Sequence, residues 1–276
     1  MSLSRRQTVA AALAALPLVP ATAGRTAARP RRPRTLHIAG DSTAAQKYAD
    51  AAPETGWGMA LPFFLTPGTR VANHAVNGRS SKSFIDEGRL TALLEGVRPG
   101  DDLLVQFGHN DQKTADPARF TEPWTTYREH LRRYVTGARE RGARPVLLTS
   151  VERRRFDAAG RAVPTHGEYP AAVRELAREE GVALVDVQAA SLAEWHRLGP
   201  GPSEEYFLWL EPGASPNHPD GVRDNTHFRP RGAIEVARLV TAGLLAAGVL
   251  DPRDVRRLDD PVPAAWISWP PPSPRT

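Results

Sequence analysis

The stretch TLHIAGDST, residues 35–43, decides the fold that this sequence predicts. Its first five residues form a short apolar run typical of a strand, and after a turn containing Gly40 the composition of residues 43–48 favours a helix. At such a junction Ser42 would hold its hydroxyl above the carboxyl end of a strand, with its backbone N–H near the positive end of a helix dipole. A nucleophile and an oxyanion donor would then come from one residue, although Gly, Asp and Ser are also the commonest turn and cap residues.

Apolar strand-like runs alternate with helical patterns from residue 35 to residue 250. Near-continuous apolar strands separated by amphipathic helices predict a parallel sheet that is covered on both faces. We therefore expect a three-layer α/β/α domain over 35–250, with a mostly parallel five-stranded sheet and a site at the carboxyl ends of its strands. The expected strands are 35–39, 70–75, 102–107, 145–150 and 182–187, and the expected helices are 57–65, 83–97, 124–141, 169–180, 188–197 and 230–247.

The first residues are expected to be a secretory leader rather than part of the domain. Arg5 and Arg6 precede an apolar run, 9–19, and small residues at 21–23 offer a cleavage site. This arrangement is typical of a signal peptide, and the paired arginines resemble a twin-arginine signal. We interpret residues 1–23 as the signal peptide and predict a secreted protein, exported through the Tat or the Sec pathway.

The segments on either side of the expected domain are rich in proline and charge. Residues 24–34 are basic and Pro-rich, and we interpret them as a linker. Residues 251–276 are rich in Pro, Arg and Asp, and we expect an irregular tail from which Trp266, Ile267 and Trp269 pack back on the surface. The polarity of this tail excludes a membrane anchor at this end of the domain.

Composition narrows the classes of function. The chain has 276 residues, of which 41% are hydrophobic and 24% charged, enough for one large domain with a sizeable core. It contains no cysteine, so disulfides, thiol chemistry and a cysteine zinc site are excluded. The net charge of +5 comes mostly from scattered arginines without an aromatic-interleaved basic stripe, so we expect no nucleic-acid partner.

Two further motifs follow the second and third expected strands. Gly78 in NHAVNGRSS, residues 73–81, lies in a strand-to-helix loop and could bring a bare backbone N–H to a substrate oxygen, or it could simply be a turn glycine. In QFGHND, residues 106–111, a buried strand runs directly into polar groups at the edge where the site is expected. There Asn110 could donate a side-chain N–H to an oxyanion, and the alternative is an Asx-turn.

The fourth motif is DNTHF, residues 224–228, just before the last expected helix. A spacing of three places the side chains of Asp224 and His227 on one side of a helical turn. The carboxylate can then accept from one imidazole nitrogen and leave the other to take a serine proton. Of the eight histidines, His227 alone has an acid so placed, and no His-x-x-x-His pattern supports a metal site.

The four motifs occur in the order of the four blocks of the SGNH (GDSL-type) hydrolase superfamily. The segments AGDST, GWG, NGRSS, FGHND and DNTHF, with the stretch from Arg154 to Pro170, resemble the rhamnogalacturonan acetylesterase family in particular. The likeness covers roughly residues 35–250, and one departure is Met59, where the family pattern has a glutamine. The resemblance implies a flavodoxin-like sheet and ester hydrolysis that needs no cofactor and no metal.

The resemblance also implies roles for individual residues. Ser42 would be the nucleophile, His227 the general base and then acid, and Asp224 the group that orients the imidazole. Ser42 and Gly78 would supply backbone N–H groups to the oxyanion hole, and Asn110 its side chain. The substrate would be an acetylated polysaccharide or oligosaccharide, above all pectic rhamnogalacturonan. Apart from the resemblance, we expect a monomer.

Four more residues are expected to contact the substrate. Trp57 and His109 lie within the shared motifs, and Arg154 and Arg155 follow the fourth expected strand. All three arginines at 153–155 leave the sheet at the edge expected to hold the nucleophile, where guanidinium groups would suit galacturonate carboxylates. A solvated loop in an arginine-rich chain is the alternative.

Three other functions remain open from the sequence. The same residues could act on acetylated xylan or other acetylated saccharides, or the protein could be a short-chain GDSL-type lipase or esterase, although no long apolar lid is evident. A non-catalytic carbohydrate-binding domain is the alternative of a different class. The presence of Ser42, Asp224 and His227 together argues against it.

Overall fold

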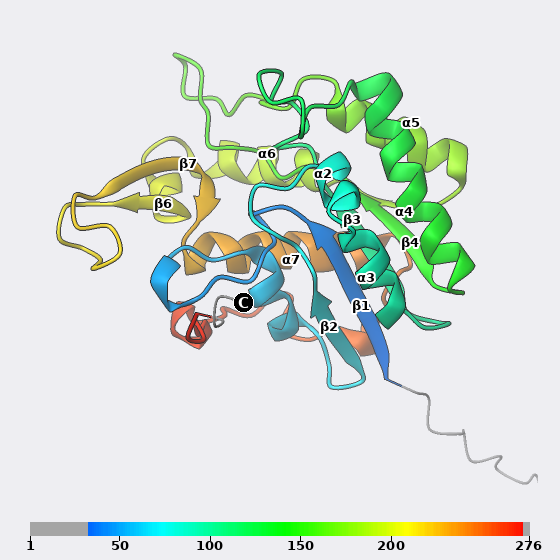
Figure 1. Ribbon diagram of the computed structural model, residues 1–276. Helices are drawn as coiled ribbons and strands as arrows, with labels where there is room; N and C mark the ends of the chain where they lie inside the picture. The colour runs from blue at the N-terminus through cyan, green and yellow to red at the C-terminus, as the bar shows by residue number, and fades with distance from the viewer. Residues whose placement is uncertain (1–32, 273–276) are drawn as a thin grey trace, which may run out of the picture. The chain divides into compact units, whose positions relative to one another are not determined.

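The computed structural model describes residues 33–272, and its centre is a sheet of five parallel strands (Figure 1). The order β2-β1-β3-β4-β5 is that of a flavodoxin-like sheet, so the expected α/β fold is confirmed. Because the order reverses beside β1, a crevice forms at the carboxyl ends of β1 and β3. The strands are β1 (Arg34–Gly40), β2 (Thr69–Asn73), β3 (Asp102–Gln106), β4 (Arg144–Leu148) and β5 (Ala183–Val185).

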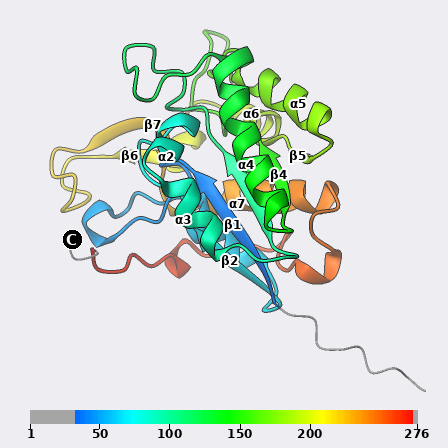
Figure 2. The same ribbon diagram turned by 45° about the vertical axis from the view of Figure 1, so that its right-hand side comes forward.

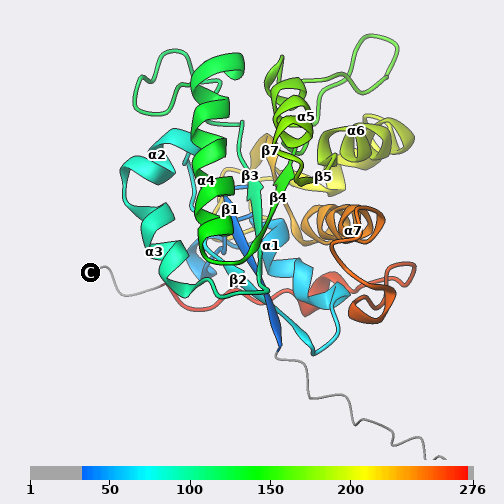
Figure 3. The same ribbon diagram turned by 90° about the vertical axis from the view of Figure 1, so that its right-hand side faces the viewer.

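Helices cover both faces of the sheet (Figures 2 and 3). Successive strand residues face opposite layers, so Leu104 packs in one hydrophobic core and Val105 in the other. One face packs against α2 (Ser81–Asp86), α3 (Arg89–Gly96), α4 (Arg128–Glu140) and α5 (Tyr169–Glu180). The other face packs against α1 (Trp57–Ala60), α6 (Val187–Leu198) and α7 (Pro230–Ala246).

Two of the expected helices are interrupted, and the residues at the interruptions explain why. The helix expected over 83–97 is divided into α2 and α3 by Gly88, whose φ of 73° is left-handed and cannot continue a right-handed helix. The helix expected over 57–65 is one α-helical turn followed by the 3₁₀ turn Leu61–Phe64, which has Pro62 at its start. A π-helical turn, Pro123–Tyr127, precedes α4.

An antiparallel hairpin outside the main sheet was not expected from the sequence. Its strands are β6 (Phe207–Leu210) and β7 (Val222–Phe228), drawn in yellow and orange in Figure 1. The DNTHF motif therefore lies on a strand, and its expected place on a helical turn is wrong. The residues of β7 are mostly polar and only the last is fully buried, which hides the apolar pattern of a strand.

The segments flanking the expected domain differ in what the structure shows of them. The expected signal peptide, 1–23, lies outside the described residues, as does most of the expected linker, 24–34. Arg34, assigned to that linker, is instead the first residue of β1, and its Nε lies 2.8 Å from the Asp102 carboxylate. The boundary of the folded part is therefore earlier than the sequence predicts.

The C-terminal segment packs on the domain up to residue 270. It contains two short 3₁₀ turns, Pro252–Asp254 and Ala264–Trp266, and Ile267 is buried in the core shared with α7. The Trp269 indole N–H donates to the Glu54 carbonyl at 2.8 Å, and the Pro270 carbonyl accepts from the Ala49 N–H at 2.9 Å. This segment is thus fastened to the loop between β1 and α1.

Candidate active site

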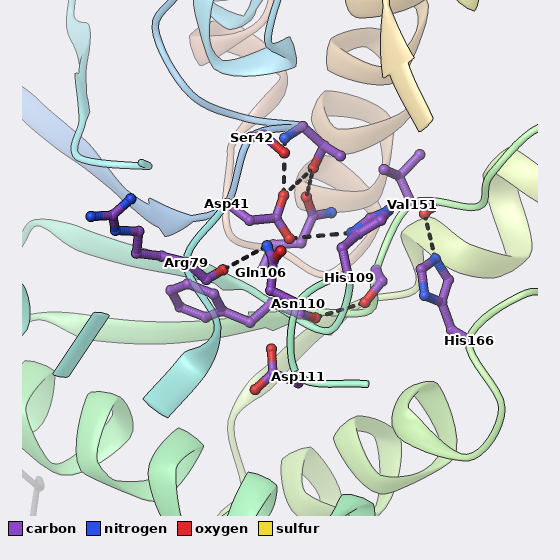
Figure 4. Close-up of polar contacts among 12 residues, drawn as sticks. Asp41, Ser42, Arg79, Gln106, His109, Asn110, Asp111, Val151 and His166 are labelled. Atoms are coloured by element: carbon purple, nitrogen blue, oxygen red, sulfur yellow. Dashed lines mark hydrogen bonds and ion pairs between the residues drawn. The ribbon is translucent and has the colours of Figure 1, made fainter. Parts of the chain in front are cut away.

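Ser42 lies in the tight turn that directly follows β1 (Figure 4). The Asp41 carboxylate closes this turn, because its Oδ1 accepts from the Thr43 N–H at 2.9 Å and from the Thr43 hydroxyl at 2.8 Å. The turn does not continue as a helix, since the carbonyls that would extend it, those of Thr43 and Ala44, accept from residues 57 and 58 instead. The expected helix over 43–48, with its dipole beside Ser42, is therefore wrong.

His227 joins Ser42 to Asp224 through two short hydrogen bonds. Its Nε2 lies 2.8 Å from Ser42 Oγ, and its Nδ1 lies 2.7 Å from Asp224 Oδ2. The other carboxylate oxygen, Oδ1, accepts from the backbone N–H groups of Thr226 at 2.6 Å and His227 at 3.0 Å, which curls the end of β7 around the acid. With a proton on Nδ1, the lone pair on Nε2 is free to accept from the serine hydroxyl.

The charge of Asp224 is fixed by its hydrogen bonds. Burial alone would raise the pKa of this carboxyl, but the His227 ring and the backbone N–H groups outweigh burial and lower the pKa to about 2. Asp224 is therefore ionised across the neutral range. An ionised partner orients the imidazole and stabilises the positive charge that forms when the ring takes a proton.

The three expected oxyanion donors lie around the same pocket as His227. Within residues 33–272, the backbone N–H groups of Ser42 and Gly78 donate to no protein acceptor. Gly78 has a φ of 76°, a left-handed conformation that glycine adopts without strain. The Asn110 amide gives one hydrogen to the Arg79 carbonyl at 3.0 Å (Figure 4), and its second hydrogen remains for a ligand.

A second histidine–aspartate pair stands behind Ser42. His109 Nδ1 lies 3.2 Å from the Asp41 carboxylate, and both side chains are buried. Burial opposes ionisation of Asp41, but His109 and Thr43 lower its pKa to about 2. His109 lines the pocket, as expected of a residue in the site wall, and it also anchors the turn that presents Ser42.

Asp111 is a buried carboxyl that holds together the loops around Asn110. It accepts from the Ser81 N–H at 3.0 Å, the Ser81 hydroxyl at 2.5 Å and the Thr121 hydroxyl at 3.1 Å. Burial, together with the nearby Asp41 charge, raises the pKa of Asp111 to about 7 in spite of these bonds. Asp111 does not line the pocket, so its role is to support the neighbouring residues.

The pocket at Ser42 is small, with a volume of about 250 Å³. A hollow of about 680 Å³ lies elsewhere, against the β6–β7 hairpin, and residues such as Trp209 and Arg223 line it. That larger hollow contains no nucleophile paired with a base, so we place the chemistry in the smaller pocket. The smaller pocket is lined by Ser42, Gly78, His109, Asn110, Lys113, Arg153, Thr226 and His227.

Arg153 is a partly buried cation that forms no ion pair with another residue between 33 and 272. Its guanidinium contacts only neutral groups, the carbonyls of Thr165 at 3.3 Å and His109 at 3.5 Å and the His166 ring at 3.4 Å. No carboxylate of the described residues lies within 4.0 Å of it. Burial lowers the pKa of Arg153, because a charged guanidinium is less stable away from water.

Arg154 does not line the pocket at Ser42, so its contact with a substrate stays a prediction. Its Nε donates to Ser203 Oγ at 3.0 Å, one Nη lies 3.0 Å from Glu204, and the guanidinium lies over the Trp209 ring at 4.3 Å. Arg154 therefore supports the β6–β7 hairpin. Arg155 is exposed and is also absent from the pocket wall, so Arg153 is the one arginine of the three that lines it.

Trp57 was expected to contact the substrate, but this is wrong because its side chain is fully buried. Its indole N–H donates to Gln106 Oε1 at 2.9 Å, and Gln106 also accepts from the Thr43 hydroxyl at 3.3 Å. Gln106 ends β3 opposite Gly40 of β1. Trp57 thus fixes the carboxyl ends of the two strands that carry the site.

No motif in the sequence marks four further functional candidates. Arg153 was named only as part of a basic run, and Lys113 was not considered, although it lines the pocket. Lys47 and Glu54 form an ion pair beside His227. Lys47 is one of three lysines in an arginine-rich chain and precedes a polar loop, a signal too weak to predict its burial.

Comparison with known proteins agrees with this fold. Residues 38–233 match the GDSL-like Lipase/Acylhydrolase family. Over 219 residues the chain is 44% identical to rhamnogalacturonan acetylesterase RhgT of Bacillus subtilis (strain 168), and this alignment covers 79% of this chain and 93% of RhgT. It is 41% identical over 214 residues to the probable rhamnogalacturonan acetylesterase YesY of the same strain, covering 78% and 94%.

Solved structures show the same fold. The crystal structure of YxiM from Bacillus subtilis superposes with a TM-score of 0.67 at 27% identity, over 78% of this chain and 57% of that one. Axe2, an acetylxylan esterase from Geobacillus stearothermophilus, superposes with a TM-score of 0.52 at 17% identity, over 79% and 95%. The chain belongs to the GDSL-like lipase/acylhydrolase family and, within it, to the rhamnogalacturonan acetylesterase family. It is a carboxylic ester hydrolase.

Between residues 33 and 272, no cluster of three or more His, Asp or Glu side chains is arranged to hold a metal ion. In the same part of the chain, no helix is long and apolar enough to cross a membrane.

Proposed function

We propose that this protein removes O-acetyl groups from plant cell-wall rhamnogalacturonan by a Ser42–His227–Asp224 acyl-enzyme mechanism. The observation that carries the proposal is the continuous hydrogen-bonded chain from Asp224 through His227 to Ser42, at the wall of a pocket with free N–H donors. The proposed substrate follows the names of RhgT and YesY, which align over nearly their whole length.

The first half of the reaction would acylate Ser42. Its Oγ attacks the acetyl carbonyl carbon while His227 Nε2, 2.8 Å away, takes the hydroxyl proton. The carbonyl oxygen becomes an oxyanion that accepts from the Ser42 and Gly78 N–H groups and the Asn110 amide. When this intermediate collapses, the C–O bond to the sugar breaks, and the His227 proton passes to the sugar oxygen, which leaves as an alcohol.

The second half would release acetate. Water attacks the acetyl carbonyl on Ser42 as His227 Nε2 takes one of its protons, and the same three donors stabilise the new oxyanion. Collapse breaks the bond to Ser42 Oγ, which recovers its proton from His227. Acetic acid leaves and loses its remaining proton to solvent as acetate, and the enzyme returns to its starting state without any cofactor.

The size of the pocket supports a short acyl group. An acetyl group fits easily in about 250 Å³, whereas a long acyl chain would need an apolar groove. The walls near Ser42 are polar or charged instead, with His109, Lys113 and Arg153 among them. Most of the binding energy would therefore come from the sugar side of the ester.

Two cations in the pocket support an acidic saccharide. Arg153 has no carboxylate partner among the described residues, and Lys113 is exposed at the pocket without a side-chain hydrogen bond there. Burial lowers the pKa of Lys113, and the neighbouring positive charges of Arg119 and Arg153 lower it further, so cations gather here. A galacturonate carboxylate would pair with these two cations.

We also propose export and a monomeric state. The leader motif in residues 1–23 supports export, since a polymeric cell-wall substrate lies outside the cell. N-terminal sequencing of protein from the culture medium tests this, and replacing Arg5 and Arg6 with lysine separates Tat from Sec export. A monomer is expected because one chain supplies every residue of the proposed site, and light scattering measures the mass.

Acetate release from a panel of acetylated polymers tests the proposed function. Purified enzyme should release acetate faster from acetylated rhamnogalacturonan than from acetylated xylan or from a neutral acetylated oligosaccharide. Preference for xylan would redirect the proposal to another acetylated saccharide. Saccharide binding without acetate release from any substrate would indicate a non-catalytic binding domain, and Ser42→Ala is the control for background hydrolysis.

A further inference from the structure

We propose that Glu54 is a positioning residue for ester hydrolysis, held beside the His227 ring by the buried Lys47. The inference rests on the proposed Ser42–His227 chemistry and adds a second carboxylate to it. Asp224 contacts Nδ1 of the ring, whereas Glu54 lies on the side of Nε2, the nitrogen that exchanges the proton with Ser42.

Lys47 and Glu54 form an ion pair in which the lysine is buried. Only 1% of the Lys47 side chain is exposed, and its Nζ lies 2.5 Å from Glu54 Oε1 and 2.6 Å from Asn77 Oδ1. Burial lowers the pKa of Lys47, and the Glu54 carboxylate is the foremost influence that opposes this. A buried ammonium is costly unless an anion accompanies it, so each member of the pair keeps the other in place.

Backbone contacts fix the distance from Glu54 to His227. Glu54 Oε1, the oxygen that Lys47 contacts, lies 4.0 Å from His227 Nε2. The next residue, Thr55, donates its N–H to the Phe228 carbonyl at 2.8 Å, immediately beyond His227 on β7. The Glu54 carbonyl also accepts from the Trp269 indole at 2.8 Å. The loop is therefore held from two sides.

This geometry gives Glu54 and Lys47 opposite effects on the protonated imidazole. When His227 takes the Ser42 proton, a carboxylate 4.0 Å from Nε2 stabilises the positive ring. An unrestrained carboxylate at that distance could also swing onto Nε2 and compete with the serine hydroxyl. Lys47 prevents this by holding the same carboxylate oxygen, and its own charge offsets part of the effect of Glu54.

Lys47 also connects the base to the oxyanion side of the pocket. Its second partner, Asn77, directly precedes Gly78, whose N–H is a proposed oxyanion donor. One ammonium thus lies between the loop that carries Glu54 and the loop that carries Gly78. Replacing Lys47 should therefore lower kcat through both loops, whereas replacing Glu54 should act through His227.

Other charges face His227, and they stay constant in the experiment. Asp224 lies on the same strand, His109 and Lys113 come from the loop after β3, and Arg153 comes from the loop after β4. Each is unchanged in the variants at 47 and 54. A difference between variants in the pH dependence therefore reports Glu54 and Lys47.

The test compares Glu54→Gln, Lys47→Met and the double variant in the pH profile of kcat/KM on a small acetyl ester. Glu54→Gln should lower kcat about tenfold with little change in KM, and should move the acid limb about 0.5 pH unit or more to lower pH. Lys47→Met should move that limb to higher pH, and the double variant should lie between them. Asp50→Asn, on the same loop and exposed, is the matched control and should leave the profile unchanged.

A titration that needs no activity separates this inference from the proposed function. The His227 ring is followed by NMR in the Ser42→Ala background, where Glu54→Gln should shift the midpoint of its titration to lower pH. Absence of acetylesterase activity with a shifted midpoint would refute the proposed function but support the effect of Glu54 on the His227 ring. An unmoved midpoint, or a pH profile altered no more than by Asp50→Asn, would overturn the inference. If Lys47→Met fails to fold, Glu54→Gln decides alone.

Discussion

Ser42 and His227 are separated by 185 residues, yet Oγ of the serine lies 2.8 Å from Nε2 of the histidine. Ser42 belongs to the turn after β1, in the main sheet, while His227 belongs to β7, in the separate hairpin. The Thr55–Phe228 bridge joins the loop after β1 to the end of β7. The contact between nucleophile and base thus depends on how the hairpin is fastened to the sheet.

The first prediction concerns the hydrogen-bonded chain. Ser42→Ala and His227→Ala should each lower kcat by a factor on the order of 10⁶, because the pair acts as a unit. Asp224→Asn should cost less, on the order of 10⁴, because the acid orients the ring and does not transfer the proton. Acetate release and a thermal melt are measured for each. A Ser42→Ala enzyme with more than about a tenth of normal turnover would refute the assignment.

The second prediction concerns the oxyanion. Asn110→Ala should lower kcat by about 10²–10³ with little effect on KM, because the amide would stabilise charge that exists only in the transition state. Asn110→Asp keeps the size but loses the donor, so it should fall as far. Thr226→Ala changes another residue of the pocket wall and should remain near normal. A loss that appears in KM alone would mean that Asn110 only binds the ester.

The third prediction concerns the length of the acyl chain. In a series of p-nitrophenyl esters, turnover should be greatest for acetate and fall steadily as the acyl chain grows. The reason is the small volume and polar wall of the pocket, which offers no apolar groove to a longer chain. Peak activity at eight or more carbons, as for a lipase, would contradict the acetylesterase proposal.

The fourth prediction concerns the two pocket cations. Arg153→Ala and Lys113→Ala should raise KM on acetylated rhamnogalacturonan while hydrolysis of a neutral acetyl ester changes little, because the lost charge would bind a carboxylate. Raising the salt concentration to about 0.5 M should weaken the same interaction, since the Debye length becomes short.

Two neighbours serve as controls for that experiment. Arg155→Ala removes an exposed arginine outside the pocket wall and should leave both substrates unaffected. Arg154→Ala should lower thermal stability, because its guanidinium bonds to Ser203 and Glu204 would be lost. If Arg153→Ala and Arg155→Ala behave alike on both substrates, the pocket does not recognise the acid.

The fifth prediction concerns pH and the buried Asp111. Burial raises its pKa from 3.8 to about 7, so between these values the folded protein keeps a proton that the unfolded chain has lost. This group therefore lowers the free energy of unfolding as pH rises through that window, by an amount on the order of 4 kcal/mol for a shift of about three pKa units. Asp111→Asn should remove this contribution.

The measurement is denaturant unfolding of both proteins at pH 5 and pH 8. Half-buried histidines such as His74, whose pKa burial lowers to about 4, act in the opposite sense, because they make the protein more stable as pH rises towards 6.5. Their contribution is the same in both proteins and cancels in the difference. Equal pH dependence in the two proteins would show that Asp111 ionises normally.

The sheet could be predicted because its central strands are buried on both faces and therefore appear in the sequence as continuous apolar runs. Parallel strands bring their carboxyl ends to one edge, so motifs that follow β1 and β3 could be placed together without knowing any contact. The hairpin could not be predicted, because β7 is polar and gains its partners from β6 and from the turn around Asp224. The DNTHF motif could be recognised in the sequence, but its place on a strand could not.

At the site, the sequence could not predict the direction in which individual side chains point. Arg153 and Arg154 are adjacent, yet one lines the pocket and the other packs on Trp209, and alternation along an extended chain sends neighbours to opposite sides. Trp57 likewise lies in a recognisable motif but faces the interior. The contact of Lys47 with Glu54 depends on the path of the intervening loop, which no periodic pattern records.

The C-terminal segment has a consequence for cutting the protein into fragments. The part shared with the GDSL-like family ends at residue 233, and α7 ends at Ala246. The family match alone would therefore suggest ending an expressed fragment near residue 250. Such a fragment would keep the sheet but lose the hydrogen bonds that Trp269 and Pro270 make to the loop after β1. The region shared with the family is therefore shorter than the region that folds together, and fragments for expression should extend beyond residue 270.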